Sequence, residues 1–161
     1  MPHIHKFSEN RIINARGPYT PLGVSRSPEP VASAVFQALQ EFADISALQD
    51  EANTVLSNYA GSGAGTVVHC AAAGITLAIA AAMTGSDSDR IAALPDTAGL
   101  RHRVVLPAGH AVNYGHPIIQ AIRLSGAKPV LAGDEVSCSL SAIAKEIAHS
   151  DTCCLLLVVS R

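Results

Sequence analysis

The chain has 161 residues, of which 48% are hydrophobic and 15% are charged, and its formal net charge is -2. This composition excludes a disordered chain, and the small negative charge gives no electrostatic reason to expect binding to nucleic acid or to an anionic membrane. The length suits one domain with a sizeable core. Because aromatic residues make up only 4%, that core must be built mainly from Ala, Val, Ile and Leu.

The pattern of the first 60 residues predicts an extended arm followed by two helices. Segment 11–30 is rich in Pro and Gly and is typical of a loop-like arm. Ser27 is expected to cap the first helix and Ser46 to cap the second, which Gly61 is expected to end. We treat residues 1–60 as one region, an N-terminal arm with two helices.

From residue 61 onward the pattern predicts strands and helices in alternation. Strands are expected over 66–70, 103–107, 128–133 and 153–160, and helices over 71–85, 116–126 and 139–151, with a short helix in the polar insertion 86–102. Continuous apolar strands separated by helices indicate an α/β fold. We expect a three-layer sandwich, in which helices cover both faces of a mostly parallel sheet.

Cysteine usage and apolar stretches indicate the compartment. The four cysteines lack the spacing of a metal site, and the adjacent pair Cys153 and Cys154 favours buried free thiols in a reducing cytoplasm. Segment 67–83 is nearly all apolar, but it is rich in Ala, broken by Gly74 and at the short limit for a membrane span. Residues 1–11 lack the apolar core of a signal peptide. We expect a cytoplasmic protein without a metal site or a membrane-spanning helix.

Both ends of the predicted strand 66–70 are candidates for binding a phosphate. The glycines of "GSGAG" (61–65) precede the strand, whereas a dinucleotide fingerprint needs them after the strand and at the start of a helix. We interpret them as a helix stop and a turn. At the other end, Ala71 and Ala72 open a helix and leave backbone N–H groups accessible to a phosphate. Close packing of that helix on the sheet explains the same small residues.

Four segments in order carry a family resemblance: "INARGPYTPLGVSRSPEPV" (13–31), "DISALQDEANTVLSNYAG" (44–61), "VVHCAAAGITLAIAAAMTG" (67–85) and "LPDTAGLRHRVVLPAGHAVNYGHPIIQAIRLSGAKPVLAG" (94–133). Together they resemble the pyridoxal-phosphate enzymes related to selenocysteine synthase (L-seryl-tRNA selenium transferase), and within that group the D-glucosaminate-6-phosphate ammonia-lyase-like branch. The resemblance implies the aspartate-aminotransferase type of fold (fold type I), pyridoxal 5'-phosphate as cofactor, and a homodimer. Residues 61–161 would then be the N-terminal part of the cofactor-binding large domain, with its remainder and the C-terminal small domain missing.

The resemblance also assigns residues to a cofactor site. The family's phosphate-binding turn falls on His69, Cys70, Ala71 and Ala72, although the family usually has Thr and Ser in place of the first two. His69 is then either a hydrogen-bond donor or a histidine satisfied in the core. His110 stands where the family places a ring against the pyridine face, and it is the candidate catalytic residue for proton transfer at the substrate carbon.

The arm and the lysines complete the assignment. Arg16 and Tyr19 match a segment that reaches toward the active site in the family, so both are candidates for substrate contacts, with a solvated loop arginine as the alternative for Arg16. The family also needs a lysine that forms a Schiff base with the cofactor. Lys6, Lys128 and Lys145 do not stand at that position. The chain therefore resembles an N-terminal fragment of a larger enzyme.

The resemblance implies a lyase that releases ammonia or eliminates a β-substituent from an amino acid or amino sugar acid. A selenium- or sulfur-transferring synthase is the alternative enzyme, and a non-catalytic truncated fragment is the alternative outside enzymes. We expect a small-molecule substrate and a homo-oligomer for the full-length protein, with neither membrane nor nucleic acid as a partner. In the chain alone, strand 66–70 is expected to be parted from the other three by a gap, which leaves unpaired strand edges. Either these edges cause aggregation, or the first strand joins the other three in a non-native sheet.

Overall fold

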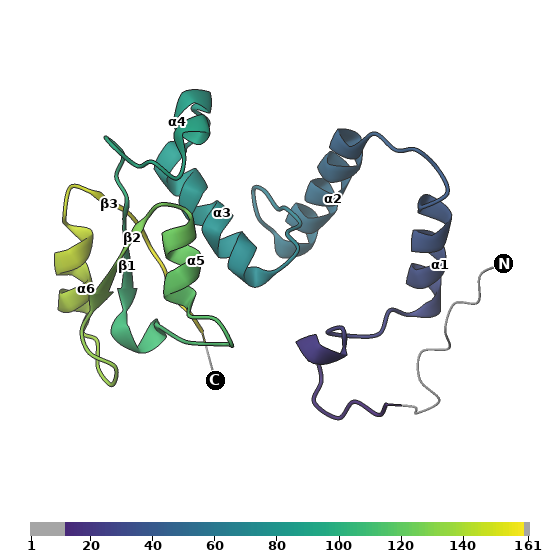
Figure 1. The fold of residues 1–161 in the computed structure, drawn as a ribbon, viewed down its shortest axis with the longest axis horizontal. Helices are drawn as coiled ribbons and strands as arrows, with labels where there is room; N and C mark the ends of the chain where they lie inside the picture. Colours follow the sequence, from purple (N-terminus) through teal and green to yellow (C-terminus); the bar gives the residue numbers. More distant parts are fainter. Residues whose placement is uncertain (1–11, 160–161) are drawn as a thin grey trace.

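The computed structural model describes residues 12–159, and an α/β unit forms its second half (Figure 1). The sheet has three parallel strands in the order β2-β1-β3, namely β1 (Arg103–Pro107), β2 (Lys128–Ala132) and β3 (Thr152–Leu155). In the central strand, Val105 pairs with Val130 on one side and with Leu155 on the other. The predicted parallel sheet is confirmed for these three strands, and the third ends earlier than expected.

Helices cover both faces of this sheet. Helices α3 (Ala71–Thr84) and α5 (Ile118–Leu124) lie on one face, and α6 (Leu140–Ile147) lies on the other (Figure 1). The chain moves from β1 through α5 to β2, and then in the opposite direction through α6 to β3. Right-handed crossovers that run in opposite directions along a sheet place their helices on opposite faces, which is the arrangement observed.

The core centres on β1. Val104, Val105 and Leu106 have no exposed surface, because β1 is flanked by a strand on each side and by helices on each face. On one face, Val104 and Leu106 pack against buried side chains of α3 and α5, which are Ile79, Met83, Ile118 and Ile122. A central parallel strand is buried on both faces, which explains why residues 104–107 of β1 are all apolar and show no alternation.

Helix α2 (Ile45–Ala60) ends as predicted and begins differently. Gly61 follows it with φ 60°, a left-handed conformation that glycine adopts without a steric penalty. At the start, the side chain of Asp44 accepts the backbone N–H of Ser46 at 2.9 Å. Asp44 therefore caps the helix, and the prediction of Ser46 is wrong by two residues, since the Asp44 carboxylate accepts the first free amides, those of Ser46 and Ala47.

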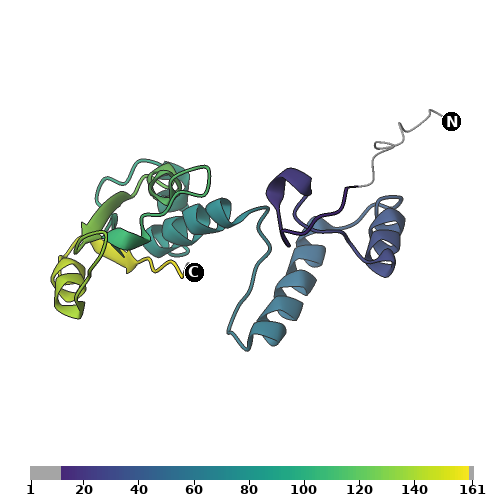
Figure 2. The ribbon, with the colours of Figure 1, turned by 90° about the horizontal axis from the view of Figure 1, so that it is seen from below.

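The N-terminal part lies to one side of the α/β unit (Figures 1 and 2). It consists of a short 3-10 helix η1 (Thr20–Leu22), helix α1 (Glu29–Ala38) and α2, and neither α1 nor α2 buries a residue. Pro28 stands at the start of α1 and no side chain caps it, so the prediction of Ser27 as the cap is wrong. The arm and two helices expected for this region are present in the described part.

Segment 66–70 departs most from expectation. It is not a strand, and Val67 is 58% exposed, so the prediction of a short buried strand is wrong. None of the three sheet strands pairs with it, and a strand needs a partner to satisfy its backbone. Of the two outcomes expected for the chain alone, joining of this segment to the other three strands is not observed. Along the chain, α3 is followed by the short helix α4 (Ser88–Ala93), which lies in the polar insertion before β1.

Helix α3 has 14 residues. Within residues 12–159, no helix is long and apolar enough to cross a membrane. The apolar segment 67–83 instead divides into an extended stretch and most of this helix. Two of its side chains, Ile79 and Met83, enter the core.

Candidate cofactor site

His110 lies just beyond the carboxyl end of the central strand. It closes the short 3-10 helix η2 (Ala108–His110) and is half-buried. Its Nδ1 accepts a hydrogen bond from the backbone N–H of Val158 at 3.2 Å. Because an accepting Nδ1 carries no proton, a neutral imidazole in this arrangement keeps its proton on Nε2. Among residues 12–159, one nitrogen of the ring is therefore anchored, while Nε2 has no hydrogen-bond partner.

The start of α3 offers unpaired backbone donors. Cys70 is the N-cap, and its Sγ accepts the N–H of Ala73 at 3.5 Å, the role that a Ser or Thr hydroxyl usually has at this position. The N–H groups of Ala71 and Ala72 have no acceptor among residues 12–159. They lie at the positive end of the helix dipole, and the side chains of Ala71 and Ala72 are single methyl groups.

One short segment connects these two features. Leu156, just after β3, and Ala71 line the same hollow of about 380 Å³ between α3 and the end of the strand. Two residues further along, Val158 holds the His110 ring. The start of α3 and His110 are thus both tied to segment 156–158, at the carboxyl edge of the sheet. This is the edge at which open parallel sheets bind their ligands.

The side chains of His69 and Cys70 are exposed. The alternative in which His69 is a core histidine is therefore wrong, because segment 66–70 leaves the sheet rather than entering it. The expectation of buried thiols is also wrong for Cys70, whereas the other three cysteines are half-buried and all four are free.

Arg16 and Tyr19 meet each other in the arm. The Arg16 guanidinium carbon lies 4.9 Å from the centre of the Tyr19 ring, within range of a cation–π contact. The Asn14 side-chain oxygen accepts the backbone N–H of Arg16 at 2.9 Å. In both views the arm, drawn in purple, lies apart from the three-stranded sheet (Figures 1 and 2). The structure therefore does not bring this pair to His110.

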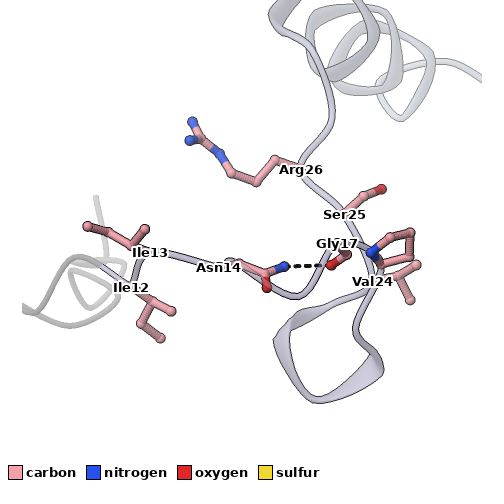
Figure 3. A pocket seen from close by; sticks show the side chains of 8 residues that line it. Ile12, Ile13, Asn14, Gly17, Val24, Ser25 and Arg26 are labelled. Carbon is pink, nitrogen blue, oxygen red and sulfur yellow. Dashed lines mark hydrogen bonds between the residues drawn. The ribbon is translucent and has the colours of Figure 1, made fainter.

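A second hollow, of about 480 Å³, lies within the arm (Figure 3). Ile12 and Ile13 line it on one side and Arg26 on another, while Asn14 donates a hydrogen bond to the Gly17 carbonyl at 2.8 Å (Figure 3). Sequence reasoning missed Arg26, and no spacing pattern singles it out. Arg16, the predicted substrate residue, is absent from the lining.

The two described lysines lie away from the carboxyl edge. Lys128 pairs with Arg103 at the start of the strands, the edge opposite to His110. Lys145 is exposed on α6, on the other face of the sheet, and Lys6 lies outside the described residues. Within residues 12–159, no group of three or more His, Cys, Asp or Glu side chains could hold a metal ion.

The α/β arrangement with its parallel three-stranded sheet matches a solved structure. That structure is of a D-glucosaminate-6-phosphate ammonia-lyase, with a TM-score of 0.84 and 36% identity over 89% of this chain and 39% of that one. In sequence, the chain is 41% identical over 123 residues to the D-glucosaminate-6-phosphate ammonia lyase of Salmonella typhimurium, which is 76% of this chain and 33% of that protein.

A further relative has a different name. The chain is 32% identical over 151 residues to a 5'-C-glycyluridine monooxygenase-decarboxylase from a Streptomyces species, covering 93% of this chain and 38% of that protein. No protein-family profile matches the chain. The chain spans between 33% and 38% of the length of these curated relatives. The predicted resemblance to the ammonia-lyase branch is supported by these matches.

Proposed function

We propose that the chain is the N-terminal part of a pyridoxal-phosphate-dependent ammonia-lyase of fold type I, acting on an amino sugar acid phosphate. The observation that carries the proposal is the joint match in structure and sequence to the solved ammonia-lyase, at a TM-score of 0.84 and 36% identity. A shared fold alone would not carry a function. The 41% identity to the Salmonella enzyme and the donors at the carboxyl edge add the necessary support.

The described residues fit the phosphate of this cofactor. The free N–H groups of Ala71 and Ala72 are two donors at a helix N-terminus, and such a terminus suits a phosphate dianion. The Cys70 sulfur is already bonded to the N–H of Ala73, so the phosphate contacts would come from the backbone. The exposed His69 stands next to these amides in sequence and would add a side-chain donor.

His110 fits the ring of the cofactor. Its imidazole is held by the N–H of Val158, and its ring and Nε2 remain available for the pyridine face and for a proton. When bound, pyridoxal phosphate withdraws electrons from the substrate α-carbon. His110 would orient that ring and hold or move a proton at Nε2. Lys128 and Lys145 would take no part, so the covalent link to the cofactor needs a lysine elsewhere in the full-length protein.

The names of the two kinds of relative suggest a substrate class. Glucosaminate is an amino sugar acid, and glycyluridine carries a glycine unit on a nucleoside. Each combines an amino acid group with a sugar. A decarboxylating monooxygenase on such a substrate is the second candidate, because that relative matches 93% of the chain against 76% for the ammonia lyase. A selenium- or sulfur-transferring synthase is named by neither relative.

The test uses the full-length protein with added pyridoxal phosphate. We expect ammonia release from D-glucosaminate 6-phosphate and an absorbance band from the bound cofactor. His110→Ala should weaken cofactor binding and slow turnover about a hundredfold, within the usual range for an acid–base residue. His149→Ala, an exposed histidine after α6, is the matched control.

Two results would contradict the proposal. If the full-length protein bound no pyridoxal phosphate, the proposed cofactor would be wrong, and so would the proposed lyase activity that depends on it. Small and equal effects of the two histidine substitutions would remove His110 from the site.

A further inference from the structure

A β-bulge in β3 changes the direction of two neighbouring thiols. Arg103 of β1 pairs with Thr152, but the next residue, Val104, pairs with Cys154. Cys153 is therefore an extra residue in β3, opposite no residue of β1. In a regular strand, adjacent side chains point to opposite faces of the sheet. A bulge breaks this alternation locally and re-aims a side chain.

The bulge brings the two sulfur atoms together. Cys153 Sγ lies 3.7 Å from Cys154 Sγ and 3.2 Å from the carbonyl oxygen of Arg103. Both cysteines are half-buried and pack against the same hydrophobic core, so they lie on one side of the sheet. Two thiols at this distance can bind one atom jointly without a change in the backbone fold.

The pair also ionises readily. The hydrogen bond with the Cys154 thiol lowers the pKa of Cys153 from 9.0 to about 7, and the same bond raises the pKa of Cys154. One proton is thus shared between two sulfurs, and the pair carries one thiolate near neutral pH. The thiolate is the form of cysteine that binds soft ions and attacks electrophiles.

A hollow gives access to the pair. Cys154 lines the hollow of about 380 Å³ between α3 and β3, together with small or apolar residues of α3 such as Gly74, Ile75 and Ala78. A ligand atom bound to sulfur here would carry an apolar substituent into an apolar space. Ala71 of the cofactor site and Cys154 of the pair both line this hollow.

We propose that Cys153 and Cys154 form a vicinal dithiol site for soft, thiophilic atoms that need only two sulfur ligands. The ligand that fits best is trivalent arsenic. Tetrahedral zinc is a poor fit, because a structural zinc site needs four ligands and no group of three suitable side chains exists within residues 12–159. Trivalent arsenic that carries one organic group needs only two sulfurs.

The binding reaction balances without an oxidant. With phenylarsine oxide, two S–H bonds break and two As–S bonds form, while the arsenic-bound oxygen leaves with both protons as one water molecule. Arsenic stays trivalent and neither sulfur is oxidised. The second As–S bond is intramolecular, so its effective concentration raises the overall affinity by about a hundredfold or more over a single thiol.

The test measures binding of phenylarsine oxide to the purified chain by intact mass and by competition. We expect one phenylarsenic group to replace two thiol hydrogens, and the product to be reversed by 1,2-ethanedithiol but not by an equal concentration of 2-mercaptoethanol. Cys153→Ser and Cys154→Ser should each raise the half-saturating concentration about a hundredfold. Cys138→Ser, another half-buried free cysteine, is the matched control and should change it less than about twofold.

A second variant tests binding at the pair without changing Cys153 or Cys154, so a folding defect caused by substituting either of them cannot affect its result. The double variant Cys70→Ser/Cys138→Ser retains only the vicinal pair and should bind with the affinity of the parent chain. Loss of binding in this variant, or equal weakening by Cys138→Ser and Cys154→Ser, would overturn the proposal. So would reversal of the adduct by the monothiol. Because no readout involves ammonia release or pyridoxal phosphate, failure here leaves the proposed function untouched.

Discussion

Gly126 gives the sharpest test of how the sheet unit is packed. It forms the turn between α5 and β2 with φ +87°, a conformation that L side chains rarely adopt. A methyl group on its Cα would overlap the carbonyl oxygen of Pro95 and lie 2.9 Å from Thr97 Cγ2. Gly99 has nearly the same backbone, with φ +75°, but nothing within 4 Å of the position that a methyl would take. Alanine at the two sites therefore separates backbone strain from steric overlap.

The expected magnitudes follow from these contacts. Left-handed strain costs Ala about 1–2 kcal/mol and applies to both variants. Overlap in a packed site adds about 1–3 kcal/mol and applies to Gly126→Ala alone. We expect the free energy of unfolding to fall by about 1–2 kcal/mol for Gly99→Ala and by about 2–5 kcal/mol for Gly126→Ala. Urea denaturation followed by far-UV circular dichroism should place the two midpoints roughly 1 M apart.

Equal losses in the two variants would refute this reasoning, since they would mean that the carbonyl of Pro95 does not contact the turn. An unchanged slope of the unfolding free energy with urea is needed to attribute the shift to the folded state.

Three further predictions concern single side chains. The rate of alkylation of Cys153 by iodoacetamide should be half-maximal near pH 7, because the pKa of Cys153 is lowered from 9.0 to about 7 and only the thiolate reacts. Cys154→Ala should move this midpoint to higher pH, which liquid chromatography–mass spectrometry of the alkylated peptide would show. Glu146→Ala should lower the free energy of unfolding by about 1–3 kcal/mol in thermal or urea unfolding, because the half-buried Arg103 then loses its ion-pair partner at 2.8 Å. The double variant Arg103→Met/Glu146→Leu should recover most of this stability. Backbone hydrogen bonds from Val136 and Ser137 hold the pKa of Asp134 below 3.8. The ionised side chain therefore stabilises its loop above pH 3.8, and this stabilisation is lost as the pH falls through the lowered pKa of the folded state. Amide exchange in the loop should show this change in the parent chain and not in Asp134→Asn.

The sequence predicted the sheet unit well because its signals are local. The uninterrupted apolar run at 104–107 marks a strand buried on both faces, and the structure places it at the centre. Segment 66–70 has the same β-branched composition but is not a strand, because a strand also needs a partner and none is in reach. Composition reports burial potential, whereas pairing depends on residues far away in the chain.

The candidate site was predictable in part. The resemblance located His110 and the start of α3, and the structure ties both to segment 156–158. The bond from Val158 to His110 spans 48 residues and leaves no trace in local spacing. The pairing of the two thiols was equally hidden, since it depends on a one-residue slip between Cys153 and Val104 that the sequence does not encode as a motif.

The lack of buried residues in α1 and α2 has a consequence for protection of their backbone amides. Helix α1 has 10 residues, fewer than the roughly 12–15 that an isolated helix needs in water, and Phe36 and Leu39 remain 68% and 81% exposed. Because no side chain of α1 is buried, its amides can open one turn at a time. Those of Val104 and Leu106 open only with the whole sheet. Deuterium should thus enter α1 almost as fast as an unfolded peptide, while β1 reports the global unfolding free energy.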